Sequence, residues 1–318
     1  MASIDPGFMA ERKSIRRRLS LWRIFSFILL LAIIGVFFTK DKNFQNIYNN
    51  HIATIEINGL ITGNKEIIAV LKEMRESKNV TAVIVYIDSP GGTTVGSEIL
   101  YDELRKLGEE KPLVAVMGTM ATSGGYIAAL SADYIVARGN TITGSIGVLL
   151  QWVRIDEGLK KLGIEVNALK SGALKAEPDF IGPTSVKTLQ VTQSLIDDSY
   201  NWFIKLVSER RKMSIEKVRK LSDGRVYTGR QALNNGLIDI LGGEEEAINW
   251  LVNSNGVSKD MIVLEWDDYL DKDIKIIPSF ASKVFGLFGI ELKNYGIFQN
   301  RITEEGLDGL LSLWHPVN

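Results

Sequence analysis

Cysteine is absent from the 318-residue sequence, and histidine occurs twice, as His51 and His315. Without thiols the chain forms no disulfide, no cysteine nucleophile and no thiolate metal site. A Ser-His-Asp site or a multi-histidine metal site needs several convergent partners, which two histidines near opposite ends do not offer. Any serine nucleophile in this chain would therefore need a base other than histidine.

Net charge is also nearly absent, since the formal value is −1. Nothing in this balance points to a nucleic-acid partner. The charges are unevenly distributed along the chain, however, because residues 1–23 carry six basic side chains and two acidic ones. The remainder is acidic, as is ordinary for a soluble domain.

The first 20 residues divide into two parts. Residues 1–8 precede a second methionine, Met9, and have the character of a cloning-derived leader, so they are left out of fold reasoning. Residues 9–20 form a basic segment, which the positive-inside rule places in the cytoplasm. Chain beyond a membrane span that follows would then lie outside the cytoplasm.

An apolar run follows over residues 24–38, interrupted by Ser26. As a helix it rises about 22 Å, short of the roughly 30 Å hydrocarbon core. Apolar residues before it, with Arg23 reaching towards the headgroups, extend the predicted transmembrane segment to residues 21–39. We expect an uncleaved signal anchor, followed by a polar tether over residues 40–50.

A cleavable signal peptide is the alternative, because its apolar core is also this short. The residues after the run, 35–42, lack small side chains at the spacing of a cleavage site. This absence favours the anchor.

Residues 51–255 are predicted to form one α/β domain with a parallel sheet. Strands are expected over residues 52–58, 81–88, 112–117, 134–137 and 164–169, and helices over residues 66–76, 184–212, 215–221, 228–235 and 244–252. Another helix after residue 92 has one apolar stripe, made of Val95, Ile99, Leu100, Leu104 and Leu107. The β-branched run 81–88 is typical of a strand buried on both faces.

Residues 256–318 are predicted to be a C-terminal extension that begins with a strand over residues 261–266. The apolar stretch 278–290 within it fits either a subunit interface or a core helix.

Two glycine-rich turns follow buried strands, at residues 89–92 and 122–125. Ligands of parallel sheets bind at the carboxyl ends of strands, where both turns lie. Ser123 stands between a strand and a helix, where free N–H groups favour an oxyanion. The alternative is that Ser123 merely caps its helix. Neither turn has the spacing of a phosphate-binding loop.

Lysine is the remaining candidate for a base. Its reference pKa of about 10.4 keeps it charged at neutral pH unless an apolar environment lowers that pKa. Lys170 and Lys175 both follow an expected strand, and a solvated surface role is the ordinary alternative for each. The residues by themselves do not choose between them.

Five short motifs occur in a fixed order: 86–92 (YIDSPGG), 120–126 (MATSGGY), 143–148 (TGSIGV), 170–175 (KSGALK) and 223–232 (DGRVYTGRQA). In this order they resemble the signal peptide peptidase A (SppA) family in its short single-domain form, within the ClpP/crotonase-like superfamily. The resemblance covers about residues 50–250. It implies repeated ββα/βα units with a parallel sheet, preceded by one transmembrane helix.

The resemblance also implies residue roles. Ser123 would be the nucleophile and Lys175 the general base, with Ser145 hydrogen-bonded to the lysine amine. The backbone N–H groups of Gly92 and Gly124 would form the oxyanion hole. A serine hydroxyl can donate to a neutral amine, which suits this role for Ser145. No metal or other cofactor is implied.

The function implied is that of a serine endopeptidase anchored in a bacterial cytoplasmic membrane, which degrades remnant signal peptides and other hydrophobic peptides. Half-length members form rings in which the serine and lysine of one site come from adjacent protomers. The alternatives are a membrane serine protease with a stomatin-type substrate and an inactive peptide-binding scaffold. A crotonase-type acyl-CoA enzyme would explain neither the anchor nor Lys175.

Overall fold

A computed structural model of the chain describes residues 18–19, 21–31, 49–266 and 311–313. The chain divides into two units, Met1–Asn50 and His51–Asn318. In the first unit, residues 18–19 and 21–31 are helical and exposed. No helix in the described ranges is long and apolar enough to cross a membrane. Residues 1–17, and residues 32–48 of the expected anchor and tether, lie outside the described residues.

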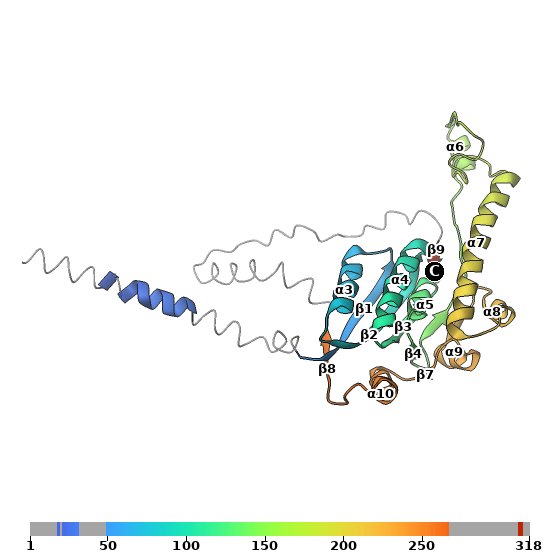
Figure 1. Ribbon diagram of the computed structural model, residues 1–318. Coiled ribbons are helices and arrows are strands. Elements are labelled where there is room, and N and C mark those ends of the chain that lie inside the picture. The colour runs from blue at the N-terminus through green and yellow to red at the C-terminus, as the bar shows by residue number, and fades with distance from the viewer. Residues whose placement is uncertain (1–17, 20, 32–48, 267–310, 314–318) are drawn as a thin grey trace, which may run out of the picture. The chain divides into compact units, whose positions relative to one another are not determined.

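The second unit is built on a mostly parallel sheet (Figure 1), with the strand order β6-β5-β3-β2-β1-β8 and with β4, β7 and β9 joined to it beside this path. The strands are β1 (His51–Ile61), β2 (Val80–Thr93), β3 (Leu113–Thr122), β4 (Tyr134–Ala137), β5 (Ile142–Gly144), β6 (Val226–Thr228), β7 (Ile240–Leu241), β8 (Ile262–Glu265) and β9 (Leu311–Leu313). Two pairs, β5–β6 and β2–β9, are antiparallel. The predicted α/β class with a largely parallel sheet is confirmed.

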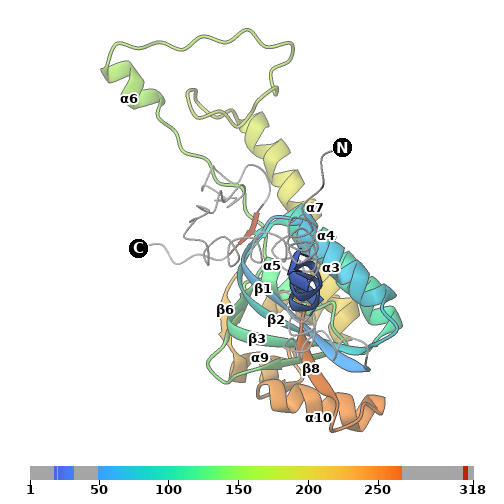
Figure 2. The same cartoon turned by 90° about the vertical axis from the view of Figure 1, so that its left-hand side faces the viewer.

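Helices cover both faces of this sheet (Figure 2). They are α3 (Lys65–Glu76), α4 (Thr94–Glu110), α5 (Gly124–Ala129), α6 (Asp156–Lys161), α7 (Val186–Arg211), α8 (Ile215–Leu221), α9 (Gly229–Asn235) and α10 (Glu244–Asn255). Along β2, Val83 and Val85 belong to the core under α3, α4 and α5, whereas Ala82 and Ile84 face α10. The expectation of a strand buried on both faces is therefore confirmed, because alternate side chains enter two different cores.

Two expectations within the domain are wrong. Residues 164–169 form no strand; they are exposed and lie away from the sheet, so they have no neighbouring strand to pair with. In α4, Leu100, Leu104 and Leu107 are buried as expected, but Val95 and Ile99 remain 64% and 42% exposed. The two are four residues apart and share the face of α4 that points away from the core, whereas Ser97 and Leu100 in the same turns are buried.

A long excursion separates β5 from α7. Residues 148–185, which we call the arm, include α6 and extend away from the sheet in both views (Figures 1 and 2). The second half of α7 is anchored in the core by Phe203 and Val207, whereas Val186 at its start is 72% exposed. The KSGALK motif therefore lies on the arm and not at a strand end.

The C-terminal extension is described in part. Its predicted first strand is confirmed as β8, which pairs in parallel with β1. The apolar stretch 278–290 lies outside the described residues, so both of its interpretations stay predictions.

The packing of α4 yields a stability prediction. Leu104 is fully buried and Val95 on the same helix is 64% exposed. We expect Leu104→Ala to lower the free energy of unfolding by about 2–5 kcal/mol, through lost burial and a cavity. Val95→Ala should change it by less than about 0.5 kcal/mol. Urea titrations of the full chain, followed by tryptophan fluorescence, measure both; equal losses would contradict the packing described.

Candidate active site

Ser123 occupies the turn between β3 and α5 in a strained conformation. Its φ is 55° and its ψ −114°, a region that residues with a side chain rarely adopt. The residue is only 1% exposed. It stands at the N-cap position of α5, yet its side chain makes no capping hydrogen bond. The capping alternative is therefore wrong. Ser123 lies on a strained strand-to-helix turn, a geometry in which some hydrolases hold their nucleophile.

Hydrogen bonds to two neighbouring strands hold this turn. The Ser123 N–H donates to the carbonyl of Gly144 at 2.8 Å. The hydroxyl of Thr122 donates to the Pro90 carbonyl at 3.1 Å, and that of Thr143 donates to the Ala121 carbonyl at 2.7 Å. The strained serine is thus fixed from β2 on one side and β5 on the other.

An irregular stretch of β3 just before the turn is held by a carboxylate. Asp88 accepts hydrogen bonds from the backbone N–H groups of Thr119, at 3.2 Å, and Met120, at 3.1 Å. Asp88 lies within the YIDSPGG motif but is not among the predicted site residues. No short-range pattern reveals this role, because its partners lie more than 30 residues away in the chain.

Gly92 lies where β1 and β2 approach most closely. A Cβ at this position would stand 1.9 Å from the Ile61 carbonyl oxygen, so only glycine fits. The preceding turn is tied to β1 by Ser89, whose buried hydroxyl donates to the Gly59 carbonyl at 2.6 Å and accepts from the Gly91 N–H at 3.0 Å. The residue predicted to donate to an oxyanion thus sits on a backbone held from both sides.

Parallel pairing brings the two turns to one edge of the sheet. Ser89 of β2 is opposite Ala121 of β3, two residues before Ser123. Gly92 and Gly124 are both buried at this edge. The structure therefore places the predicted nucleophile and both predicted oxyanion donors at the carboxyl ends of adjacent strands.

The same edge also accepts an extended segment. The short strand β9 pairs antiparallel with residues 91–93 of β2, with Ser312 opposite Gly92. An extended chain can thus dock by backbone pairing beside the candidate oxyanion site.

Ser145 lies close to this turn. It directly follows Gly144, whose carbonyl holds the Ser123 N–H. It is 7% exposed, has a φ of 50°, and donates its N–H to the Arg225 carbonyl at 2.9 Å. Within the described part of the chain its hydroxyl has no hydrogen-bond partner. The DGRVYTGRQA motif, which contains Arg225, therefore supports the strand end that carries Ser145.

The two candidate lysines differ in their surroundings. Lys170 forms ion pairs with Glu177, at 3.0 Å, and Asp179, at 3.3 Å. The hydrogen bond to Glu177 raises the pKa of Lys170, which holds it in the charged form and makes it unsuited to accept a proton. Lys175 is exposed and makes no ion pair or side-chain hydrogen bond with any described residue. Of the two, Lys175 is the one without a carboxylate partner among the described residues.

The structure does not bring Lys175 to Ser123 within one chain. The arm that carries residues 170–175 extends away from α5 in both views (Figures 1 and 2). The hydrogen bonds of Lys170 and of the Lys175 backbone stay within the arm. One chain therefore supplies the serine, the oxyanion donors and Ser145 at one place, and the lysine at another.

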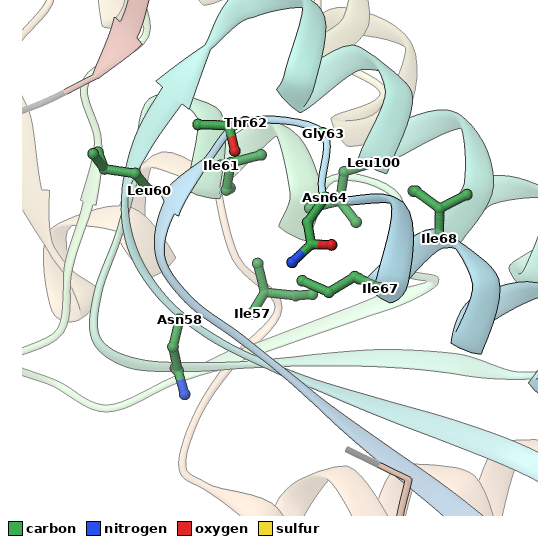
Figure 3. Close-up of a pocket in the computed structure, with 10 residues that line it drawn as sticks. All are labelled: Ile57, Asn58, Leu60, Ile61, Thr62, Gly63, Asn64, Ile67, Ile68 and Leu100. Carbon is green, nitrogen blue, oxygen red and sulfur yellow. The ribbon is translucent and has the colours of Figure 1, made fainter. Parts of the chain in front are cut away.

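A small, mostly apolar pocket lies on the β1 side of Gly92 (Figure 3). Its apolar lining comes from the end of β1 and from two helices, namely Ile57, Leu60, Ile61, Ile67, Ile68 and Leu100. Ile61 pairs with Gly92 in the sheet, so this lining adjoins the candidate oxyanion strand. Among the described residues, no group of three or more His, Asp or Glu side chains could hold a metal ion.

The close approach at Gly92 can be tested directly. We expect Gly92→Ala to lower the free energy of unfolding by about 1–3 kcal/mol, because the new methyl group must push β1 away. Gly158→Ala is the control, since no atom lies within 4 Å of a Cβ added there and alanine suits its helix. Thermal unfolding measures the stability of both variants. Unchanged stability of Gly92→Ala would contradict this geometry.

Comparisons with known proteins add a fold neighbour and named relatives. A ClpP1 variant from Listeria monocytogenes matches with a TM-score of 0.41 and 15% identity, over 61% of this chain and 92% of that one. Protease 4 of Haemophilus influenzae is 33% identical over 249 residues, which are 73% of this chain and 40% of that protein. This chain thus spans less than half the length of that relative.

Two other relatives are covered over most of their length. The Synechocystis sp. protein slr0021, which is named as a protease, is 39% identical over 70% of this chain and 80% of its own length. An Enterococcus faecium protein named signal peptide peptidase SppA is 32% identical over 72% of this chain and 70% of its own length. Residues 105–258, which contain Ser123, Ser145 and Lys175, match the family model described as Peptidase family S49. The chain therefore belongs to peptidase family S49.

Proposed function

We propose that this peptidase is a membrane-anchored serine endopeptidase in which Ser123 of one copy and Lys175 of a neighbouring copy form the catalytic dyad. The observation that carries the proposal is the turn at Ser123, which is strained, buried and braced by two strands, and whose side chain does not cap α5. A strained serine that serves no capping role is the mark of a nucleophile and argues against an inactive scaffold.

The proposed chemistry uses groups of the protein alone. The Ser123 Oγ attacks the peptide carbonyl while its proton passes to the neutral Nζ of Lys175. The N–H groups of Gly92 and Gly124 stabilise the negative oxygen that forms. The amine product leaves with the proton from Lys175, and water then hydrolyses the acyl-serine by the same route. Ser145 would donate its hydroxyl to the lysine amine and orient it.

A neighbouring copy is proposed as the source of Lys175 because the arm carries exposed apolar side chains. Val153, Leu162 and Leu169 are 68%, 74% and 107% exposed, and Phe180 is 59% exposed. Apolar side chains gathered on one exposed element are typical of an interface. An arm of each copy that lies on the next copy makes a head-to-tail contact, and such contacts form a ring when the rotation between successive copies closes. Burial of the Lys175 side chain by the neighbouring copy would also disfavour its charged ammonium form.

The proposed substrates are extended apolar peptides, chiefly remnant signal peptides. Backbone pairing of β9 with Gly92 and its neighbours supports docking of an extended peptide, and the apolar pocket beside Gly92 supports apolar side chains. The name of the Enterococcus faecium relative supports the signal-peptide assignment. A stomatin-type substrate would use the same site. Turnover of each peptide class in a mixture of the two therefore distinguishes the two substrate assignments.

The dyad is tested by single variants and by mixing. We expect Ser123→Ala and Lys175→Ala each to lower kcat/KM on a fluorogenic apolar peptide at least about a thousand-fold. When the two inactive proteins are dissociated, mixed in equal amounts and reassembled, about a quarter of wild-type activity should return, because each ring site then draws its serine and lysine at random. Activity that survives in Ser123→Ala would overturn the proposal. No recovery on mixing would exclude shared sites.

The membrane anchor has a test of its own. Residues 9–20 are basic and residues 21–39 mostly apolar, which is the composition of a signal anchor. We expect the full-length protein to stay with membranes after alkaline carbonate extraction, and a variant without residues 9–39 to be released. Release of the full-length protein would contradict anchoring, while leaving the dyad unaffected.

A further inference from the structure

The loop that presents Lys175 is closed by charges at its two ends. Lys170 stands before residues 171–176, and Glu177 and Asp179 stand after them. The Nζ of Lys170 lies 3.0 Å from Glu177 and 3.3 Å from Asp179, and all three side chains are between 17% and 23% exposed. We call these three residues the clamp. Partial shielding from water makes such a three-membered network stronger than an isolated surface ion pair.

The clamp is also attached to the start of α7. The hydroxyl of Thr188 donates to Glu177 at 3.5 Å, and Thr188 in turn contacts Ser185, the N-cap of α7, at 2.8 Å. Asp179 accepts the backbone N–H of Ile181 at 2.6 Å. Since the second half of α7 is buried in the core, the clamp ties the loop to a rigid element.

Within the loop, little else holds the backbone. Lys175 donates its N–H to the Gly172 carbonyl at 3.1 Å, and residues 171–173 and 175–176 are exposed. Ala176, next to Lys175, has a φ of 61°, which is unfavourable for any residue other than glycine. Leu174 is the one half-buried residue of the loop, and Glu177 donates its N–H to the Leu174 carbonyl at 3.3 Å. With so little packing the loop needs a further restraint to keep this conformation, and the clamp supplies it.

We propose that Lys170, with Glu177 and Asp179, is a positioning group that keeps this loop closed and so presents Lys175 to Ser123 of the neighbouring copy. The proposal rests on the proposed function for the role of Lys175. Ionisation supports it, because the hydrogen bond to Glu177 raises the pKa of Lys170 and the backbone hydrogen bond from Ile181 lowers the pKa of Asp179. The Lys170–Asp179 pair therefore stays charged at neutral pH.

The first test measures the loop and needs no catalysis. In a Ser123→Ala background, limited digestion with a protease that cleaves after lysine reports how readily the chain opens at Lys175. We expect Lys170→Met to speed this cleavage about three- to ten-fold, as loss of a partly shielded ion-pair network would. Lys220→Met is the matched control, because Lys220 pairs with Glu216 at 2.9 Å at an exposed site elsewhere. An unchanged rate in Lys170→Met would overturn the clamp.

The second test asks which half of the active site the clamp serves. We expect Lys170→Met to lower kcat about 10- to 100-fold with little change in KM, because the base is misplaced and not lost. Reassembly of Lys170→Met with Ser123→Ala should restore about a quarter of wild-type activity, since Ser123→Ala supplies an intact loop. Reassembly with Lys175→Ala should restore none, because neither chain then presents the lysine correctly.

The outcomes separate this proposal from the one it rests on. Failure of Ser123→Ala and Lys175→Ala to complement each other would refute the shared dyad, and the cleavage rate at Lys175 would still decide whether the clamp holds the loop. If that pair complements but Lys170→Met recovers with neither partner, the residue serves general folding and the proposal is wrong. Recovery with Lys175→Ala instead would place its effect on the serine half, which also overturns it.

Discussion

The parallel pairing of β2 with β3 is the constraint on which the rest of the site depends. Parallel strands end at the same edge of a sheet, so the turn at Gly92 and the turn at Ser123 meet there although about 30 residues separate them. The turn at Ser123 takes a conformation that an isolated peptide would avoid, and the turn at Gly92 packs against the backbone of β1. The close approach of β1 to Gly92 and the hydrogen bonds that the Thr122 hydroxyl and the Ser123 N–H donate to the carbonyls of Pro90 and Gly144 hold them in place. Strain at the turn persists because the surrounding sheet over-determines it.

The second unit combines a densely packed core with an arm that is largely exposed. Alternate side chains of β2 enter two cores, and α5, which begins directly after Ser123, is buried along its whole length. By contrast, the arm keeps apolar side chains such as Leu162 and Leu169 in contact with water. This contrast is the structural basis for the proposed site assembled from two copies, in which the core of one copy would hold the serine and the arm of the other would supply the lysine.

The ion pairs of the arm differ in role from most surface ion pairs, because they hold one loop in shape. A single exposed pair contributes little to stability. Lys170, Glu177 and Asp179 instead bridge the two ends of one loop and connect it to α7. Their geometry also separates the two lysines of one motif. Lys170 is held charged by its partners, whereas Lys175 is presented at the surface without one among the described residues.

Much of the core could be predicted from the residues, because its signals are local. The β-branched run of β2, the apolar period of α4 from Leu100 onward, and the capping serines and threonines of α7, α8 and α9 are each contained within a few residues. The short strands β5, β6 and β7 were not predicted, since strands of two or three residues have too few side chains to show a period. The strand expected at residues 164–169 was wrong because an apolar run is a strand only where a neighbour pairs with it.

For the site, the sequence by itself determined which residue types are available: a serine between a strand and a helix, glycines at two strand ends, lysines after them, and no cysteine and two histidines to compete. These are properties of composition and order. Only the tertiary structure decided that Ser123 is strained and does not cap its helix, that Lys170 is bound by carboxylates, and that the lysine motif lies on an arm away from the serine. The first and the third depend on contacts between residues distant in the chain, or on their absence, and such contacts leave no local trace in the order of the residues. The ion pairs of Lys170 span only seven and nine residues, but they form because the loop between the charges folds back on itself, which the order of the residues does not reveal.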